Sequence, residues 1–440
     1  MSSFPHPRRA GSPRSFAFEH WLLWLLFGFT AVFAGTAGAL VAVLLPQQIM
    51  PQILSPADKS AFRDDQLRAA SLDYSLNILV LGVDGIDSEE DQQTSHSNLP
   101  VRSDTLLFVR FNPDSNKIAL LSIPRDTRVP IPGYGTQKIN AAHALGGPAL
   151  TARVVSQMLG DIPIDRYVRL NSQGIAALID AVGGVEVYVS ERMKYTDVTQ
   201  KLYIDLEPGL QRLNGEQAHQ FVRFRQDALG DIGRVQRQQQ LMRALSLELL
   251  KPTTWAKAPV ILQAVRDNLD TNLTWEELLS LAKFMLTSGQ DSLDMVLLPG
   301  RFSQPYEYST SYWLPDPEGV YQIAVNYFDA QPSQGDLLPT PPNRLRIAVQ
   351  NATGQAEIAR KMAQELRNKG FTSVFAVEDA HQMLEQTQII AQQGDLQGAL
   401  EVQSLLGLGQ TIVESTGTLD SDITIKVGQD WLSIRDPLQP

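Results

Sequence analysis

The chain has 440 residues, a formal net charge of −11 at pH 7 and 43% hydrophobic residues. This length predicts two to four domains with ample apolar material for a core. The acidic balance argues against a general nucleic-acid binder, which would show a basic domain, and the absence of cysteine from the sequence excludes disulfides and cysteine-based metal or redox chemistry.

Near the N-terminus, residues 21–45 predict a transmembrane helix. The cytoplasmic segment that we expect before it, residues 1–20, carries three arginines, and the next 25 residues carry no charge. A helix of this length would reach about 37 Å at ~1.5 Å per residue, enough to cross a hydrocarbon core of about 30 Å. The basic flank places residues 46–440 outside the inner or plasma membrane. A cleaved signal peptide is the alternative, because Ala37-Gly38-Ala39 resembles a cleavage site.

A folded α/β domain is expected over residues 75–328, after a polar stalk at 46–74 that contains several prolines. Its first strand is the apolar run Leu76 to Asp84, which is typical of a buried central strand. Asp104 to Asn112 and Lys117 to Ile123 are joined by a short turn and should form an antiparallel hairpin.

The ends of these strands predict a charged site at one edge of the sheet. If the first strand is antiparallel to the second, Asp84 meets Asp104 there, and the third strand delivers Arg125 and Asp126 to the same edge. Aspartates beside arginines, without a nucleophile–base pair, suit phosphoryl or pyrophosphoryl chemistry, in which the carboxylates would hold Mg²⁺. Each aspartate alone also fits a turn or cap role.

The rest of this domain continues the alternation of helices and strands. Gly147 to Leu159 and Ser172 to Val182 predict helices, and Gly183 to Val189 a turn and a strand. We attach residues 252–330 to the same domain. They contain a predicted helix and a predicted strand, at Thr274 to Thr287 and Asp294 to Leu298.

Sixteen positions near the middle of the chain hold an unusual cluster of positive charge. The cluster consists of four arginines and a neutral glutamine: Arg223, Arg225, Arg234, Arg237 and Gln238. The first two alternate with Phe224, so on a strand both guanidinium groups would project from one face. The other three lie at helical spacing in a helix that opens just after Asp231-Ile232-Gly233, whose free N–H groups would add to the arginines. An anion, a phosphate above all, is expected to bind there, and the alternative is a solvated charged face.

A linker rich in Pro, Gln and Gly, residues 329–342, precedes a small C-terminal α/β domain, residues 343–430. Leu345 to Gln350 and Ser373 to Val377 predict strands, with an amphipathic helix at Gln355 to Lys369 between them. The linker indicates that this domain folds as a separately tethered unit.

Nine short motifs resemble the LytR-CpsA-Psr (LCP) family in their order and spacing. They are Leu81–Asp84, Arg102–Thr105, Ser122–Thr127, Lys138–Asn140, Ala144–Pro148, Asp180–Val185, Leu213–Ala218, Val222–Arg225 and Asp231–Gln238. These core motifs cover residues 75–250, and residues 343–430 resemble the LytR-type C-terminal domain. The resemblance implies an LCP-like catalytic domain with a central mixed β-sheet flanked by helices.

For function, the resemblance implies a membrane-anchored phosphotransferase or ligase. Such an enzyme transfers a glycan from a polyprenyl-pyrophosphate carrier to peptidoglycan with Mg²⁺. The metal would lie at Asp84 and Asp104, with Arg125 beside them as the third catalytic residue. The candidate pyrophosphate-binding residues are Arg102, Arg125, Lys138, Arg223, Arg225, Arg234, Arg237 and Gln238. The implied partners are the lipid-linked glycan, peptidoglycan and membrane lipid, and not nucleic acid.

Two motifs depart from the family pattern. Gly85-Ile86-Asp87 follows the first aspartate, where the family usually has an arginine, and Lys138-Ile-Asn-Ala-Ala-His143 replaces Lys-Ile-Asn-His-Ala-Tyr. The first departure leaves room for a non-enzymatic, membrane-anchored binder or regulator of envelope assembly. A lipid pyrophosphate pyrophosphatase would use the same residues with water as the acceptor. A prenyl chain would need an apolar cavity, for which Ile175 to Ile179 and Val185 to Val189 are candidates, although both also suit a core.

Overall fold

The computed structural model describes most of the chain after the predicted membrane segment. The described residues are 58, 60–62, 72, 74–83, 103–198, 202–224, 231–255, 257–265, 268–289, 292–330, 345–380 and 382–435. The predicted transmembrane helix at 21–45 lies outside them. Among the residues that the structure describes, no helix has the length and apolar character needed to cross a bilayer. They belong to one compact unit, residues 51–440.

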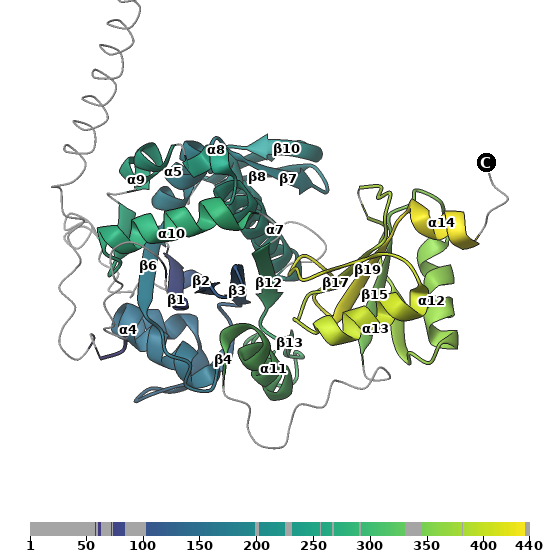
Figure 1. Ribbon diagram of the computed structural model, residues 1–440, viewed down its shortest axis with the longest axis horizontal. Coiled ribbons are helices and arrows are strands. Elements are labelled where there is room, and N and C mark those ends of the chain that lie inside the picture. The colour runs from purple at the N-terminus through teal and green to yellow at the C-terminus, as the bar shows by residue number, and fades with distance from the viewer. Residues whose placement is uncertain are drawn as a thin grey trace, which may run out of the picture. The chain divides into compact units, whose positions relative to one another are not determined.

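A six-stranded mixed sheet organises the larger part of this unit (Figure 1). In spatial order its strands are β11 (Leu269–Thr271), β6 (Arg166–Asn171), β1 (Leu76–Val83), β2 (Ser103–Asn112), β3 (Lys117–Ile123) and β12 (Leu293–Leu297). β1, β2 and β3 pair antiparallel, as predicted, whereas β6 adds to β1 and β12 to β3 in parallel. The predicted mixed α/β class is therefore confirmed.

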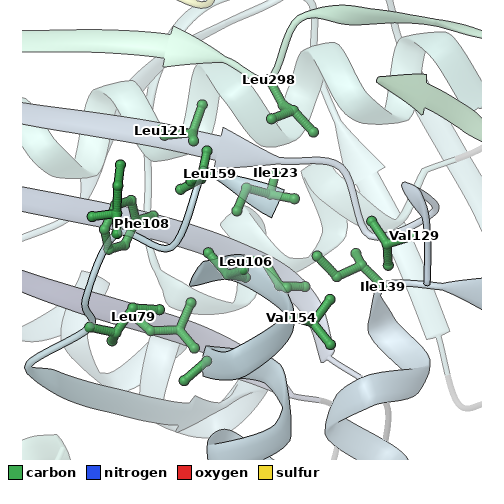
Figure 2. Packing of buried hydrophobic residues seen from close by; sticks show 14 of the residues in the cluster. Leu79, Leu106, Phe108, Leu121, Ile123, Val129, Ile139, Val154, Leu159 and Leu298 are labelled. Carbon is green, nitrogen blue, oxygen red and sulfur yellow. The ribbon is translucent and has the colours of Figure 1, made fainter. Parts of the chain in front are cut away.

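Both faces of the central strands are buried, which explains their nearly continuous apolar runs. Leu79, Phe108 and Leu121 point into one core, shown in Figure 2, under α4 (Asn140–Met158) and α11 (Pro317–Phe328). The alternate side chains Ile78, Leu107 and Leu120 pack on the other face, under α10 (Trp275–Ser288). Figure 1 shows α4 and α10 on opposite sides of the sheet.

α4 is interrupted at Gly146 and Gly147, both of which have non-helical backbone angles. Gly147 has a φ of 58°, a conformation that glycine adopts without a Cβ clash, and Pro148 then begins a second helical stretch. The helix predicted from Gly147 to Leu159 corresponds to this second stretch.

A third apolar core lies among the elements that hold the described part of the arginine cluster. α5 (Ser172–Val182) and the hairpin-like pair β7 (Val185–Val189) and β10 (Gly209–Leu213) pack with β8 (Met193–Asp197) and β9 (Leu202–Leu206). α6 (Gly215–Arg223) and α7 (Asp231–Leu249) complete this core with Phe221, Leu241 and Leu245. The shorter elements are β4 (Arg128–Ile131), β5 (Gly135–Lys138), α8 (Pro252–Trp255), α9 (Ala258–Val265), β13 (Gly300–Phe302) and β14 (Trp313–Pro315).

The strand predicted around Arg223 is wrong, because residues 215–223 form the helix α6. Asn214 starts it with a capping box: its side chain accepts from the Gln217 backbone N–H at 2.9 Å, and the Gln217 side chain accepts from the Asn214 N–H at 3.1 Å. Ala218 and Phe221, three residues apart, then bury one helical face. Local capping thus outweighs the short alternation of charge and aromatic residues.

The C-terminal part of the unit has its own five-stranded sheet. Its spatial order is β16 (Ser373–Ala376), β15 (Arg346–Asn351), β19 (Ile423–Val427), β17 (Gln388–Ala391) and β18 (Gln410–Ile412). α12 (Ile358–Asn368) connects β15 to the parallel β16, and α13 (Leu396–Leu406) connects β17 to the parallel β18. These helices and α14 (Gln429–Arg435) cover a separate apolar core.

Candidate functional site: a polar and an apolar cavity beside the sheet edge

The end of β1 and the start of β2 meet through an irregular pairing. Gly82 pairs with Thr105 and Val83 with Ser103, so Asp104 is the extra residue of a β-bulge. Bulges re-aim side chains and are frequent beside active sites. The backbone of Asp104 is described within β2, whereas its side chain lies outside the described residues, as do Asp84, Arg102 and Arg225.

Arg125 and Asp126 lie on a tight turn directly after β3. The Thr127 backbone N–H donates to the Pro124 carbonyl at 2.9 Å, and the Thr127 hydroxyl donates to the same oxygen at 2.5 Å. Lys138 Nζ lies 2.9 Å from an Asp126 carboxylate oxygen, and Arg125 Nε lies 3.8 Å from the other. Since both members of the pair Arg125 and Asp126 remain partly exposed, a ligand can reach them.

Two further segments hold this turn in place. The Trp313 N–H donates to the Asp126 carbonyl at 3.0 Å, and the Asn140 N–H donates to the Arg125 carbonyl at 3.2 Å. The Ile139 N–H donates to the Thr127 carbonyl at 2.8 Å. The guanidinium of Arg125 is therefore carried on a backbone that hydrogen bonds from β14 and from the start of α4 hold in place.

α7 presents Arg234 and Gln238 on one face, because they are four residues apart. Arg234 lies in the first turn of this 19-residue helix, where free N–H groups and the positive end of the helix dipole attract anions. α7 begins at Asp231, slightly earlier than the sequence suggests. Arg223 is the last residue of α6.

These side chains line two adjoining cavities. The polar cavity, about 40 Å³, is lined by residues that include Ser122, Arg125, Asp126, Arg234, Gln238 and Gln239. The apolar cavity, about 90 Å³, is lined by residues that include Ile175, Ala176, Ile179, Val222, Leu241 and Arg223. Thr105, Arg234, Gln238 and Met242 belong to both linings. The site thus joins a cavity of mixed lining, which holds the charged residues and also Leu106, Phe302 and Trp313, to a mainly apolar cavity.

The structure separates residues that the sequence grouped together. Arg237 is 7% exposed and lines neither cavity. Its Nη2 donates to the Phe224 carbonyl at 2.5 Å, and this hydrogen bond connects α7 to the end of α6. Lys138 also lines neither cavity and instead pairs with Asp126. A direct phosphate contact by either residue remains a prediction. His143 is buried in α4.

The sequence offered two segments as candidates for the lining of an apolar cavity. Ile175 to Ile179 of α5 supplies three residues of the lining. β7 supplies none, because its valines are buried in the third apolar core. Gln239, for which the sequence predicted no role, also lines the polar cavity; it is 4% exposed and donates from Nε2 to the Ser122 hydroxyl at 2.6 Å. A neutral amide inside the run Gln238 to Gln240 carries no local signal of such a role.

Comparison with known proteins identifies the class to which this fold and site belong. Residues 52–326 match the model of the LytR_cpsA_psr family, and residues 344–431 match that of the LytR cell envelope-related transcriptional attenuator domain. The chain therefore belongs to the LytR-CpsA-Psr family and carries a LytR-type C-terminal domain, as its motifs predicted.

The similar proteins include two named transferases. TagU of Halalkalibacterium halodurans, a polyisoprenyl-teichoic acid–peptidoglycan teichoic acid transferase, is 38% identical over 229 residues, which are 51% of this chain and 69% of that protein. TagV of Bacillus subtilis, which has the same descriptive name, is 32% identical over 275 residues, 61% of this chain and 68% of that protein. The crystal structure of gbs0355 from Streptococcus agalactiae superposes with a TM-score of 0.51 at 26% identity, covering 59% of this chain and 90% of that one.

Proposed function

We propose that this protein is a membrane-anchored transferase that moves a glycan phosphate from a polyprenyl-pyrophosphate carrier to peptidoglycan. The observation that carries the proposal is the junction of the two cavities, where Arg234 and Gln238 face both the polar cavity and the apolar one. A lipid pyrophosphate is a ligand with this division between anion and hydrocarbon. The names of the relatives TagU and TagV support transfer to peptidoglycan.

In this proposal the apolar cavity receives the first part of the prenyl chain. A volume of about 90 Å³ holds only a small part of a polyprenyl group, so the rest must leave the protein toward the bilayer. Ile175, Val222 and Leu241 line this cavity, and Arg223 lies beside them. Binding the hydrocarbon here would leave the pyrophosphate next to Arg234.

The arginines stabilise the charge that moves during transfer. When an acceptor hydroxyl attacks the phosphorus next to the glycan, the bond to the bridging oxygen breaks and that oxygen leaves with the prenyl phosphate. Arg234 and the N-terminal turn of α7 would neutralise the departing phosphate. Arg125, held on its fixed turn, would bind the phosphoryl group that is transferred.

The proposed metal ligands are carboxylates, which match the preference of Mg²⁺ for oxygen donors. Asp84 and Asp104 would supply the hard carboxylate oxygens that this ion prefers. Asp104 is the extra residue of the bulge, next in sequence to Ser103, which pairs with Val83, the residue directly before Asp84. Among the described residues no group of three or more His, Cys, Asp or Glu side chains forms a competing metal site. Asp84 and Asp104 would hold the ion, which would supply positive charge to offset the negative charge of the phosphate groups.

One product assay tests the proposal. The full chain is incubated with a short-chain glycosyl prenyl pyrophosphate, Mg²⁺ and peptidoglycan fragments, and the products are separated by mass. We expect peptidoglycan that carries the glycan phosphate, together with free prenyl phosphate. Free glycan phosphate alone identifies a pyrophosphatase, and no Mg²⁺-dependent turnover identifies a binder or regulator. The same proposal places the protein in the inner or plasma membrane, with its N-terminus in the cytoplasm and the site outside.

A further inference from the structure

The outer edge of β12 is covered by the C-terminal domain. β12 is the last strand of the large sheet, so its outward N–H groups need partners from elsewhere. The Met295 N–H donates to the Val413 carbonyl at 3.2 Å, and the Leu297 N–H donates to the Gln392 carbonyl at 3.1 Å. Both acceptors belong to the C-terminal domain, which therefore closes this edge.

The same contact continues into the core beneath the sheet. Leu419 is 2% exposed and belongs to the apolar cluster formed by β1, β2, β3 and α4, and Val413 packs against that cluster. The Tyr327 hydroxyl donates to the Gly394 carbonyl at 3.0 Å, and Arg243 of α7 pairs with Glu414 at 2.5 Å. Apolar, hydrogen-bonding and ionic contacts thus join the C-terminal domain to the domain that holds the site.

One of these contacts reaches the lining of the polar cavity. The Ser415 hydroxyl donates to Gln239 Oε1 at 2.7 Å, and Gln239 Nε2 donates to the Ser122 hydroxyl at 2.6 Å. All three side chains are nearly inaccessible, with exposed fractions of 1%, 4% and 6% from Ser415 to Ser122. A buried amide needs both partners, because an unsatisfied polar group is costly in a dry interior.

This chain of hydrogen bonds ends beside the proposed anion-binding groups. Ser122 is the penultimate residue of β3, three positions before Arg125, and Gln239 follows Gln238 on α7. Ser122 and Gln239 both line the polar cavity together with Arg125 and Arg234. Ser415 therefore begins a chain of two hydrogen bonds that passes through the middle of α7 and reaches the end of β3.

We propose that the C-terminal domain completes the site, with Ser415 as a positioning residue that fixes Gln239 and, through it, the spacing between Arg125 and Arg234. The ligand in this inference, a prenyl pyrophosphate, rests on the proposed function. If docking of the domain improves ligand binding, ligand binding must stabilise docking to the same degree. The domain is then part of the binding machinery, in contrast to the separately tethered unit that its linker predicts.

The test compares two variants that each lose one hydroxyl from this contact. Ser415→Ala removes the donor to Gln239, whereas Tyr327→Phe removes a donor to Gly394 that has no link to the polar cavity. Affinity of the full chain in detergent for farnesyl pyrophosphate is measured by calorimetry. We expect Ser415→Ala to weaken binding about tenfold, the effect of one misplaced charged hydrogen bond, and Tyr327→Phe to stay within about twofold of wild type.

A second measurement uses hydrogen exchange of residues 411–418. Farnesyl pyrophosphate should slow exchange in this segment of the wild type, and should slow it less in Ser415→Ala. If circular dichroism shows that Ser415→Ala is unfolded, Ser415→Cys replaces it, since the thiol is a weak donor of similar size.

The outcomes separate this inference from the function on which it rests. Loss of affinity in Ser415→Ala alone supports the positioning role. Equal affinities in both variants, or equal losses, overturn it, because Ser415 then contributes to docking at most. A wild type that does not bind farnesyl pyrophosphate overturns the proposed lipid ligand, and the inference falls with it.

Discussion

At the scale of single residues, the site depends on where each charged group is anchored. Arg125 is carried by a turn whose carbonyls accept hydrogen bonds from two other segments, and Arg234 by the first turn of a long helix. Both side chains line the polar cavity, although about a hundred residues separate them in the chain. Arg237 is close to Arg234 in sequence, but its guanidinium donates to the Phe224 carbonyl. Sequence proximity alone is therefore a poor guide to which arginines line the same cavity.

We predict that Asp104→Asn, and separately Asp84→Asn, will remove most Mg²⁺-dependent turnover. The exchange deletes a charged oxygen ligand at nearly constant volume, so the fold should persist. Turnover of the short-chain donor is measured against Mg²⁺ concentration, with the thermal unfolding midpoint as the control. Activity within about twofold of wild type in both variants would refute the metal assignment.

Arg234→Lys should weaken binding of a prenyl pyrophosphate almost as much as Arg234→Ala. A lysine ammonium is a point charge and cannot make two parallel N–H contacts to one phosphate. Each lost charged hydrogen bond should cost roughly 1.5–3 kcal/mol of binding free energy. Arg153→Lys on the exposed part of α4 is the matched control. Full affinity in Arg234→Lys would show that only general positive potential matters there.

At the scale of secondary-structure elements, the pairing of β12 with β3 partly buries the Asp294 carboxylate, which disfavours its charged form. Asp294 lies on β12, and burial raises its pKa above the ordinary value, an effect that Lys117 at 3.6 Å only partly opposes. The folded state therefore holds the Asp294 proton more tightly than the unfolded state does. Asp294 therefore contributes fully to the free energy of unfolding below its ordinary pKa. That contribution is lost as pH rises through the raised pKa of the folded state.

Asp294→Asn should consequently become more favourable relative to wild type as pH rises. The asparagine does not titrate, so the difference in unfolding free energy between variant and wild type should grow from pH 4 to pH 7 in favour of the variant. Urea unfolding of both proteins at each pH measures this difference. A difference that is constant over this range, or that shrinks, contradicts the assigned burial of the charge.

Elements with a strong local signal were the ones predicted well. The apolar runs of β1 and β3 and the periodic pattern of α5 lie where the sequence placed them. The strand predicted around Arg223 is wrong because the alternation of charged and aromatic residues there is short. The capping box at Asn214 and the buried face of α6 favour a helix instead.

At the scale of the whole molecule, the C-terminal domain bears on the stability of the catalytic domain. A fragment that ends at Gln331 loses Leu419 from the core and both acceptors on the β12 edge. Losing one buried leucine costs about 2 kcal/mol, which corresponds to a fall of roughly 5 °C in the melting temperature of a domain of this size. Calorimetric scans of the full chain and the fragment measure it. Equal melting temperatures for the catalytic domain would show that the two domains are independent.

Local pattern by itself determined the α/β class, the first three strands, the family and most of the candidate anion-binding residues. These follow from short-range features: runs of apolar residues, helical periodicity and motif spacing. Only the tertiary structure decided that β12 closes the sheet against the C-terminal domain, that Arg237 faces Phe224, and that Ser415 contacts Gln239 across 176 residues. Such contacts depend on how whole layers pack, and a serine or glutamine looks the same in sequence whether it is solvated or buried in a network.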